Sequence, residues 1–196
     1  MLLSRRDILE EIKRGRLRFD PKIDPKQVKQ VSIDLHIGRL FTTFKDTNAF
    51  KYIQAVRADP SIWDSPDVWD HKESDSFTIE PGGFVLGQTL ESVCLPSNLA
   101  GLIEGRSGYA RLGISMHFTA PKIDPGFDGT IALEMSNHGS LPVVLVAGED
   151  RPAQLLLFRL SRPLTKNELY GADEGDIFQG STEPIPRKRR QQPKKK

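Results

Sequence analysis

The sequence predicts a mainly β protein of the sandwich or jelly-roll kind, with a short helix at its N-terminus. Runs of apolar and β-branched residues follow one another from Phe77 to Leu160, and turn-forming residues separate them at intervals of roughly 8–12 residues. The order shows no alternation of strand and helix patterns, so a parallel sheet with crossover helices is not expected. The length of 196 residues suits one domain with its own hydrophobic core.

The N-terminal helix is predicted from its cap and its apolar stripe. Ser4 is a suitable N-cap, and Asp7 three residues later completes a variant of the capping box. Ile8 and Ile12 follow at helical spacing. Gly15 is suited to end the helix, after which an extended segment begins.

The strands are predicted from alternation and from turn residues. Residues 31–38 alternate apolar and polar side chains, as a half-buried strand does, and residues 39–44 continue it. Residues 45–75 are polar and read as an inserted loop, whose Trp63 and Trp69 we expect to pack it onto the body. The other strands are expected at 77–80, 84–88, 91–95, 99–104, 114–118, 130–136, 141–146 and 154–160.

Composition limits the classes of protein. No apolar run approaches the roughly 20 residues that cross a bilayer, and the N-terminus has no signal-peptide core, so a cytoplasmic protein is expected. The formal net charge of +2 comes from residues 187–196, while the rest is mildly acidic. A basic tail can contact nucleic acid, but a disordered, solvated terminus is the preferred interpretation.

The cysteine and histidine content argues against a zinc deaminase. Cys94 is the single cysteine, whereas zinc cytidine deaminases need a Cys-x-x-Cys pair and a further ligand. The four histidines show no metal-binding spacing, so no protein metal site is predicted. Any deamination by this chain is therefore expected to activate water without zinc.

The stretch from Gly105 to Gly113 has the composition of an anion-binding loop. Its arginines, Arg106 and Arg111, carry planar guanidinium groups that suit phosphate oxygens, and Ser107 offers a hydroxyl between them. The glycines permit tight turns and close approach of the backbone. An ordinary loop with two surface arginines explains the same residues equally well.

Two acids follow within thirty residues. Asp124 lies in the turn-rich loop 120–129, and Glu134 lies in an apolar strand. Strict alternation places Glu134 on one face with Ala132 and Ser136, opposite the large apolar residues. A lone acid in a strand is usually solvated, but a carboxylate near fixed cations can stay ionised and act as a base.

These blocks together resemble the dCTP deaminase family of the dCTP deaminase/dUTPase superfamily. The resemblance is carried by Gly-Arg-Ser-Gly-Tyr-Ala-Arg-Leu-Gly from Gly105, by Ile-Asp-Pro-Gly-Phe from Ile123 and by Leu133-Glu134. Ser-Ile-Asp-Leu-His-Ile-Gly from Ser32 and the N-terminal Leu-Ser-Arg-Arg-Asp-Ile also match. The matching blocks are colinear over about residues 1–165.

The resemblance implies a distorted jelly-roll or β-barrel of the dUTPase type, a homotrimer with sites between subunits, and Mg²⁺ bound through the nucleotide triphosphate. It implies Glu134 as general base, with Ser107, Arg111 and the Ala120 carbonyl as further catalytic groups. It divides the chain into a deaminase domain (1–165), a nucleotide-closing arm (166–186) and a basic tail (187–196). The nucleotide-binding residues that it implies are Arg106, Ser107, Gly108, Tyr109, Ala110, Arg111, Asp124, Ala132, Leu133, Glu134 and Tyr170.

Some positions depart from the family pattern. Ile177 and Ser181 stand where members carry a lysine and a glutamine in the arm, and residues 147–152 replace the usual Pro-Gly-Met. We expect hydrolytic deamination of dCTP to dUTP and ammonia. Two alternatives remain: a bifunctional enzyme that continues to dUMP, because Asp124 matches the acid with which dUTPases activate water, and a catalytically weak nucleotide-binding regulatory protein.

Overall fold

The computed structural model describes residues 1–45, 68–173 and 175–185, and it confirms a mainly β fold with a short N-terminal helix. The helix α1 (Arg5–Lys13) begins at Ser4, whose side chain accepts a hydrogen bond from the Asp7 backbone and whose own backbone bonds the Asp7 carboxylate. Arg14 caps its end, and Gly15 follows with φ 69°, a conformation that glycine adopts easily. The predicted capping box is therefore confirmed.

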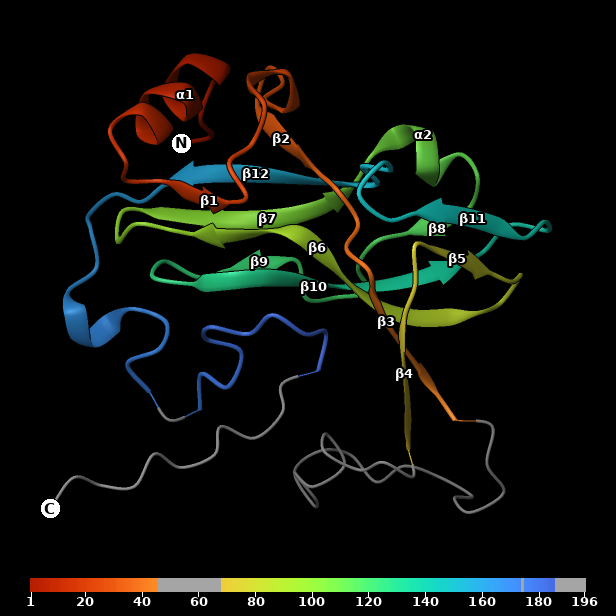
Figure 1. Cartoon of the computed structure of the whole chain (residues 1–196). Helices are drawn as coiled ribbons and strands as arrows, with labels where there is room; N and C mark the ends of the chain where they lie inside the picture. The colour runs from red at the N-terminus through yellow and green to blue at the C-terminus, as the bar shows by residue number, and fades with distance from the viewer. Residues whose placement is uncertain (46–67, 174, 186–196) are drawn as a thin grey trace, which may run out of the picture.

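Two larger sheets and a small one make up the body (Figure 1). The six-stranded sheet runs β4 (Trp69–Glu73), β3 (Leu40–Phe44), β6 (Phe84–Cys94), β10 (Asp128–Asn137) and β8 (Ile114–Ser115), and β1 (Arg18–Asp20) also pairs with β6. The four-stranded sheet runs β2 (Ser32–Leu35), β12 (Ala153–Arg159), β7 (Leu99–Gly105) and β9 (Lys122–Ile123). The third sheet pairs β5 (Ser76–Ile79) with β11 (Val143–Val146), and all these pairings are antiparallel.

The hydrophobic core lies between the two larger sheets. Ile33 and Leu155 from the four-stranded sheet join Val85 and Leu133 from the six-stranded sheet in one buried cluster. Burial alternates between residues 131 and 135 of β10, because Ile131, Leu133 and Met135 are buried whereas Ala132 and Glu134 are half-buried. Ser136, which was expected on the face of Glu134, is buried as well. The face of Glu134 that the sequence predicted, opposite the large apolar residues, is thus confirmed.

Several predicted elements were wrong in extent. Residues 84–88 and 91–95 were expected as two strands, but β6 is one continuous strand of 11 residues. Residues 45–75 were expected as a loop, but 69–73 form β4, which pairs along the whole of β3. Residues 114–118 were expected as a strand, but only β8 forms there.

Of the two tryptophans in the expected loop, Trp69 lies within the described residues and Trp63 does not. Trp69 is 6% exposed and stacks on Phe44 with ring centroids 4.4 Å apart, so packing onto the body is confirmed for this residue. Trp63 lies outside the described residues, as does the basic tail 187–196.

The segment after β12 packs against the six-stranded sheet. It contains the 3₁₀ turn η3 (Lys166–Glu168) and passes on the opposite side of the sheets from α1 (Figure 1). The backbone of Gly180 donates to Asp128 O at 2.7 Å, and that of Thr130 donates to Ser181 O at 2.9 Å. The arm is therefore hydrogen-bonded to the start of β10.

Candidate active site

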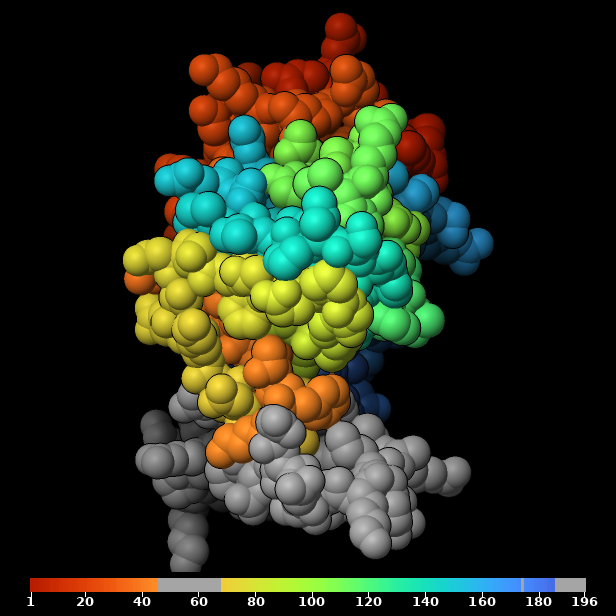
Figure 2. Space-filling model, turned by 90° about the vertical axis from the view of Figure 1, so that its right-hand side faces the viewer, coloured from red at the N-terminus to blue at the C-terminus, as the bar shows by residue number. Residues whose placement is uncertain are grey.

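The predicted anion-binding stretch forms a short helical turn rather than an open loop. The turn α2 (Ser107–Ala110) follows β7 directly, with Arg106 at its N-cap and Arg111 at its C-cap. Ser107, Gly108, Ala110 and Arg111 are exposed. Together with the segments around β5 and β11, this region forms the side of the molecule seen in Figure 2. The side chains that the sequence singled out for phosphate contact are therefore open to a ligand.

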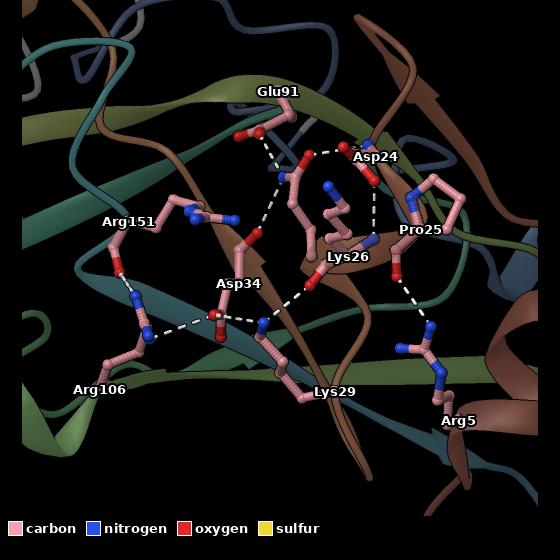
Figure 3. A network of polar contacts seen from close by, with 10 residues as sticks. Arg5, Asp24, Pro25, Lys26, Lys29, Asp34, Glu91, Arg106 and Arg151 are labelled. Atoms are coloured by element: carbon pink, nitrogen blue, oxygen red, sulfur yellow. Dashed lines mark hydrogen bonds and ion pairs between the residues drawn. The ribbon is translucent and has the colours of Figure 1, made fainter.

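Arg106 is held from two sides (Figure 3). Its Nε lies 3.3 Å from Oδ2 of Asp34, and its Nη1 donates to the carbonyl of Arg151 at 2.8 Å. Its backbone N–H donates to Pro152 O at 2.8 Å. The guanidinium is fixed before any ligand arrives, and its Nη2 has no hydrogen-bond partner among the described residues. Fixed donors of this kind suit recognition of phosphate.

Asp34 is itself fixed by a buried polar network. It lies on β2 and is 3% exposed, and its carbonyl accepts a hydrogen bond from Gln27 Nε2 at 2.9 Å. The same amide nitrogen donates to Glu91 Oε1 at 2.8 Å, and Nδ1 of His36 lies 2.6 Å from that oxygen. Sequence reasoning missed this network, because its members are up to 64 residues apart along the chain.

Tyr109 ties α2 to the turn that departs from the family pattern. Its hydroxyl donates to Oδ1 of Asp150 at 2.7 Å, and Oδ2 of Asp150 accepts from the Val146 backbone at 2.7 Å. Burial and the bond to Asp150 raise the pKa of Tyr109 to about 12. The hydroxyl therefore stays protonated and keeps donating throughout the neutral range. The residues 147–152 thus support α2 despite their unusual sequence.

A pocket of about 400 Å³ opens beside α2. Four residues that the sequence predicted for nucleotide binding line it, namely Arg106, Ser107, Gly108 and Tyr109. Sequence reasoning missed the others, which come mainly from β2 and the turn before it: Lys29, Gln30, Val31, Ser32, Asp34 and Gln154.

Glu134 lies on β10 with its side chain half-buried. Its Oε2 accepts a hydrogen bond from the backbone N–H of Phe118 at 3.0 Å, and Leu86 is its register partner on β6. Among the described residues its other carboxylate oxygen has no hydrogen-bond partner. Ala120 follows Phe118 by two residues and is exposed. The carboxylate is thus oriented by one donor and retains capacity to bind water.

Asp124 and Tyr170 lie near each other at the loop that leads from β9 into β10. Asp124 forms an ion pair with Lys122 at 2.8 Å. The backbone of Tyr170 donates to Pro125 O at 2.9 Å, and its ring packs on Phe127 at 5.8 Å. Gly126 has φ 89°, and a Cβ there would meet the Leu169 side chain at 2.8 Å. Glycine is therefore required where the arm crosses this loop.

The predicted site residues fall into two groups within one chain. Arg106, Ser107, Gly108 and Tyr109 share the pocket, and among the described residues its lining includes neither Glu134 nor Asp124. Leu133 is wholly buried in the core, so only its backbone is available to a ligand. Over the described ranges, no cluster of three or more His, Cys, Asp or Glu side chains is arranged to hold a metal ion.

Comparison with known proteins decides the family. Residues 2–160 match the family described as dCTP deaminase-like. The chain belongs to this family. The resemblance that the sequence motifs indicated is therefore confirmed.

No helix of the described residues is long and apolar enough to span a membrane.

Similar proteins correct the expected end product. A protein from Mycolicibacterium gilvum named "dCTP deaminase, dUMP-forming" is 42% identical over 189 residues, covering 96% of this chain and 95% of its own. One from Clavibacter michiganensis with the same name is 41% identical, covering 94% of this chain and 88% of its own. The deaminase class predicted here agrees with these names. The expectation of dUTP as end product was wrong, since the names state dUMP.

The solved structures support the fold. The 2'-deoxycytidine 5'-triphosphate deaminase from Agrobacterium tumefaciens superimposes with a TM-score of 0.62 at 22% identity, covering 81% of this chain and 48% of that one. This chain therefore spans about half the length of that solved protein. The predicted jelly-roll-like β fold is confirmed.

Proposed function

We propose that the chain is a bifunctional, dUMP-forming dCTP deaminase, which converts dCTP and two waters to dUMP, pyrophosphate and ammonia. The observation that carries the proposal is the Glu134 carboxylate, oriented by the Phe118 N–H on an accessible face of β10. Relatives at 41–43% identity over nearly the whole chain are named for this product. We place the enzyme in the cytoplasm.

Deamination needs a base for water, because C4 of cytosine is a weak electrophile. Glu134 takes a proton from a water held by the Ser107 hydroxyl and the Ala120 carbonyl, and the resulting hydroxide adds to C4. The protonated glutamate passes its proton to N3. Glu134 then takes the proton of the added hydroxyl and passes it to the amino group, so that the bond from C4 to the amino nitrogen breaks, ammonia leaves and C4 becomes a carbonyl. Proton transfer of this kind contributes roughly 10²–10⁴-fold in rate.

The second reaction cleaves the triphosphate. Asp124 takes a proton from a water that attacks the α-phosphorus, the bond to the bridging oxygen breaks, and pyrophosphate leaves with the oxygen. Arg106 and Arg111 bind the phosphates, and Mg²⁺ carried by the triphosphate would neutralise part of its charge. The Lys122 ammonium lies 2.8 Å from Oδ1 of Asp124 and holds this carboxylate in place.

We propose a homotrimer with sites between subunits. Within one chain the pocket at α2 does not include Glu134 or Asp124 among its lining. A neighbouring copy that brings its own Glu134 to this pocket completes the set of phosphate donors and base. Closed rotational symmetry of this kind is usual for soluble oligomers.

Product analysis tests the proposed function. The protein is incubated with dCTP and MgCl₂, nucleotides are separated by anion exchange, and ammonia is assayed. We expect dUMP as the final nucleotide, with one ammonia for each. Accumulation of dUTP as end product contradicts the bifunctional proposal, and dCTP binding without turnover instead supports a regulatory role.

A further inference from the structure

Lys29 lies across a buried carboxylate from Arg106, in the pocket beside α2 (Figure 3). Its Nζ is 3.7 Å from Oδ2 of Asp34, the same oxygen that Arg106 Nε approaches to 3.3 Å. The Asp34 side chain is 4% exposed, whereas those of Lys29 and Arg106 are 41% and 36% exposed. Two accessible cations therefore share one inaccessible anion, and the pair keeps a surplus positive charge toward the pocket.

The geometry leaves donors free for a ligand. The Lys29 ammonium donates to the Lys26 carbonyl at 2.7 Å, but its distance from Asp34 is too long for a hydrogen bond. Oδ2 of Asp34 is buried and has no hydrogen-bond partner among the described residues, although both cations lie near it. Both cations are thus attracted to Asp34, and each keeps N–H groups that can donate to a ligand.

The backbone holds Lys29 in this place. The N–H of Lys29 donates to the Ser32 carbonyl at 2.7 Å, and Val28 bridges to Ile33. This tight turn follows the 3₁₀ turn η1 (Pro25–Gln27), whose Asp24 cap is complete. The base of the Lys29 side chain is therefore fixed, although its ammonium is accessible.

The arm lacks a positive charge that the family pattern has, so another cation is needed to bind the triphosphate. Position 177, where the family pattern has a lysine, is an isoleucine with 47% of its surface exposed. On the proposed function, a neighbouring copy brings Glu134 to this pocket, while Lys29 and Arg106 belong to the chain that forms it. These two cations suit the distal phosphates, which carry most of the negative charge of the nucleotide.

We infer that Lys29 and Arg106 form a subsite for the distal phosphates of the nucleotide, with Asp34 as the residue that positions both cations. This inference rests on the proposed function for the identity of the nucleotide. It assigns to Lys29 the positive charge that Ile177 does not supply. A purely structural lysine that neutralises Asp34 is the competing explanation, and it makes no contribution that depends on the number of phosphates.

Binding measurements separate the two explanations. In a Glu134→Gln background, which prevents deamination, dissociation constants for dCTP and dCMP are measured by calorimetry with and without Lys29→Met. A charge-assisted hydrogen bond contributes about 1.5–3 kcal/mol, so we expect the dCTP constant to rise roughly 10–100-fold. The dCMP constant should change by less than about 3-fold, because dCMP has no distal phosphates. Lys29→Arg should restore most of the dCTP affinity.

Lys26→Met is the matched control. Lys26 is an exposed lysine in the preceding turn η1 and does not line the pocket, so its loss removes the same net charge. The dissociation constant of Lys26→Met for dCTP should stay within about 2-fold of that of the parent protein, since salt screens an exposed charge that lies outside the pocket. Equal effects of Lys29→Met and Lys26→Met, or equal weakening of dCTP and dCMP by Lys29→Met, overturn the inference.

Inorganic tripolyphosphate distinguishes failure of the subsite from failure of the proposed function. If the parent protein binds no deoxycytidine nucleotide, the proposed function fails. Weaker tripolyphosphate binding by Lys29→Met than by Lys26→Met still supports the phosphate subsite in that case. Identical tripolyphosphate binding by the two variants overturns it.

Discussion

At the scale of single residues, Glu134 is the position on which deamination depends. Its carboxylate is oriented by one backbone N–H and can accept a proton, whereas an amide of the same shape cannot. We expect Glu134→Gln to lower the rate of ammonia release by at least about 10²-fold while dCTP still binds. Ammonia assays and calorimetry on the same preparation measure the two quantities.

Glu80→Gln is the matched control for this substitution. Glu80 is exposed in the turn after β5 and lines no part of the pocket, so its rate should equal that of the unmodified protein. Near-normal ammonia release by Glu134→Gln would show that another group acts as the base.

Substitution of Asp124 is expected to stop the release of pyrophosphate while deamination continues. Replacing its carboxylate by an amide removes the proposed base for attack on phosphorus but leaves Glu134 in place. Asp124→Asn should therefore still release ammonia and should accumulate dUTP, with pyrophosphate release slowed by roughly 10²-fold or more. Asp128→Asn is the control, because Asp128 is an exposed acid at the start of β10, and this variant should still yield dUMP. Unchanged pyrophosphate release by Asp124→Asn contradicts the assignment.

The sequence predicted only part of these features of single residues. The alternation around Glu134 follows from the strand period, and the composition of residues 105–113 indicated an anion-binding stretch. Lys29 and Asp34 were missed because their link to Arg106 is a contact across 77 and 72 residues of chain, which no local pattern records. The sequence suggested a half-buried strand at 31–38, yet all four residues of β2 are buried.

At the scale of elements, long-range pairing overrode local signals. The sequence predicted two strands at 84–88 and 91–95, but β6 pairs with β10 over most of its length and is one strand. The strand β4 was not predicted, because most of its residues are polar. Its backbone hydrogen bonds come from pairing with β3, which the sequence of β4 alone does not indicate. Strand propensity depends on such context.

The attachment of α1 to β12 makes a prediction about acid stability. Glu11 is 2% exposed and bonds Arg16 at 2.6 Å and Arg159 at 2.8 Å. The hydrogen bond from Arg16, assisted by that from Arg159, lowers the pKa of Glu11 from 4.5 to about 2. The native state thus holds this carboxylate ionised more strongly than the unfolded chain does. Its contribution to stability is complete above about pH 4.5 and is lost as the pH falls toward 2.

Glu11→Gln should therefore lower the free energy of unfolding by roughly 1–3 kcal/mol at pH 7, and the difference should shrink as the pH approaches 2. Urea unfolding followed by circular dichroism at several pH values measures it. The control is Glu10→Gln, which removes an exposed pair with Arg14. That variant should change stability by less than about 0.5 kcal/mol. A Glu11→Gln effect that is the same at every pH would argue against the ion-pair explanation.

At the scale of the whole molecule, the separation of α2 from Glu134 predicts an assembly that shares its sites. Ser107→Ala and Glu134→Gln should each be inactive alone. Mixed oligomers should recover roughly a quarter of the wild-type rate, because random cyclic assembly gives that share of interfaces an intact Ser107 and an intact Glu134. The measurement is ammonia release after co-refolding of the two variants. No recovery in verified mixed oligomers would place each site within one subunit.

The central claim is that one chain carries both reactions, and the most direct test follows ammonia and pyrophosphate together. Purified protein is given dCTP with Mg²⁺, and both products are quantified in the same samples through the time course. Ammonia and pyrophosphate are expected to rise in equal amounts while dUMP accumulates. Ammonia without pyrophosphate, with dUTP persisting to the end of the reaction, would contradict it.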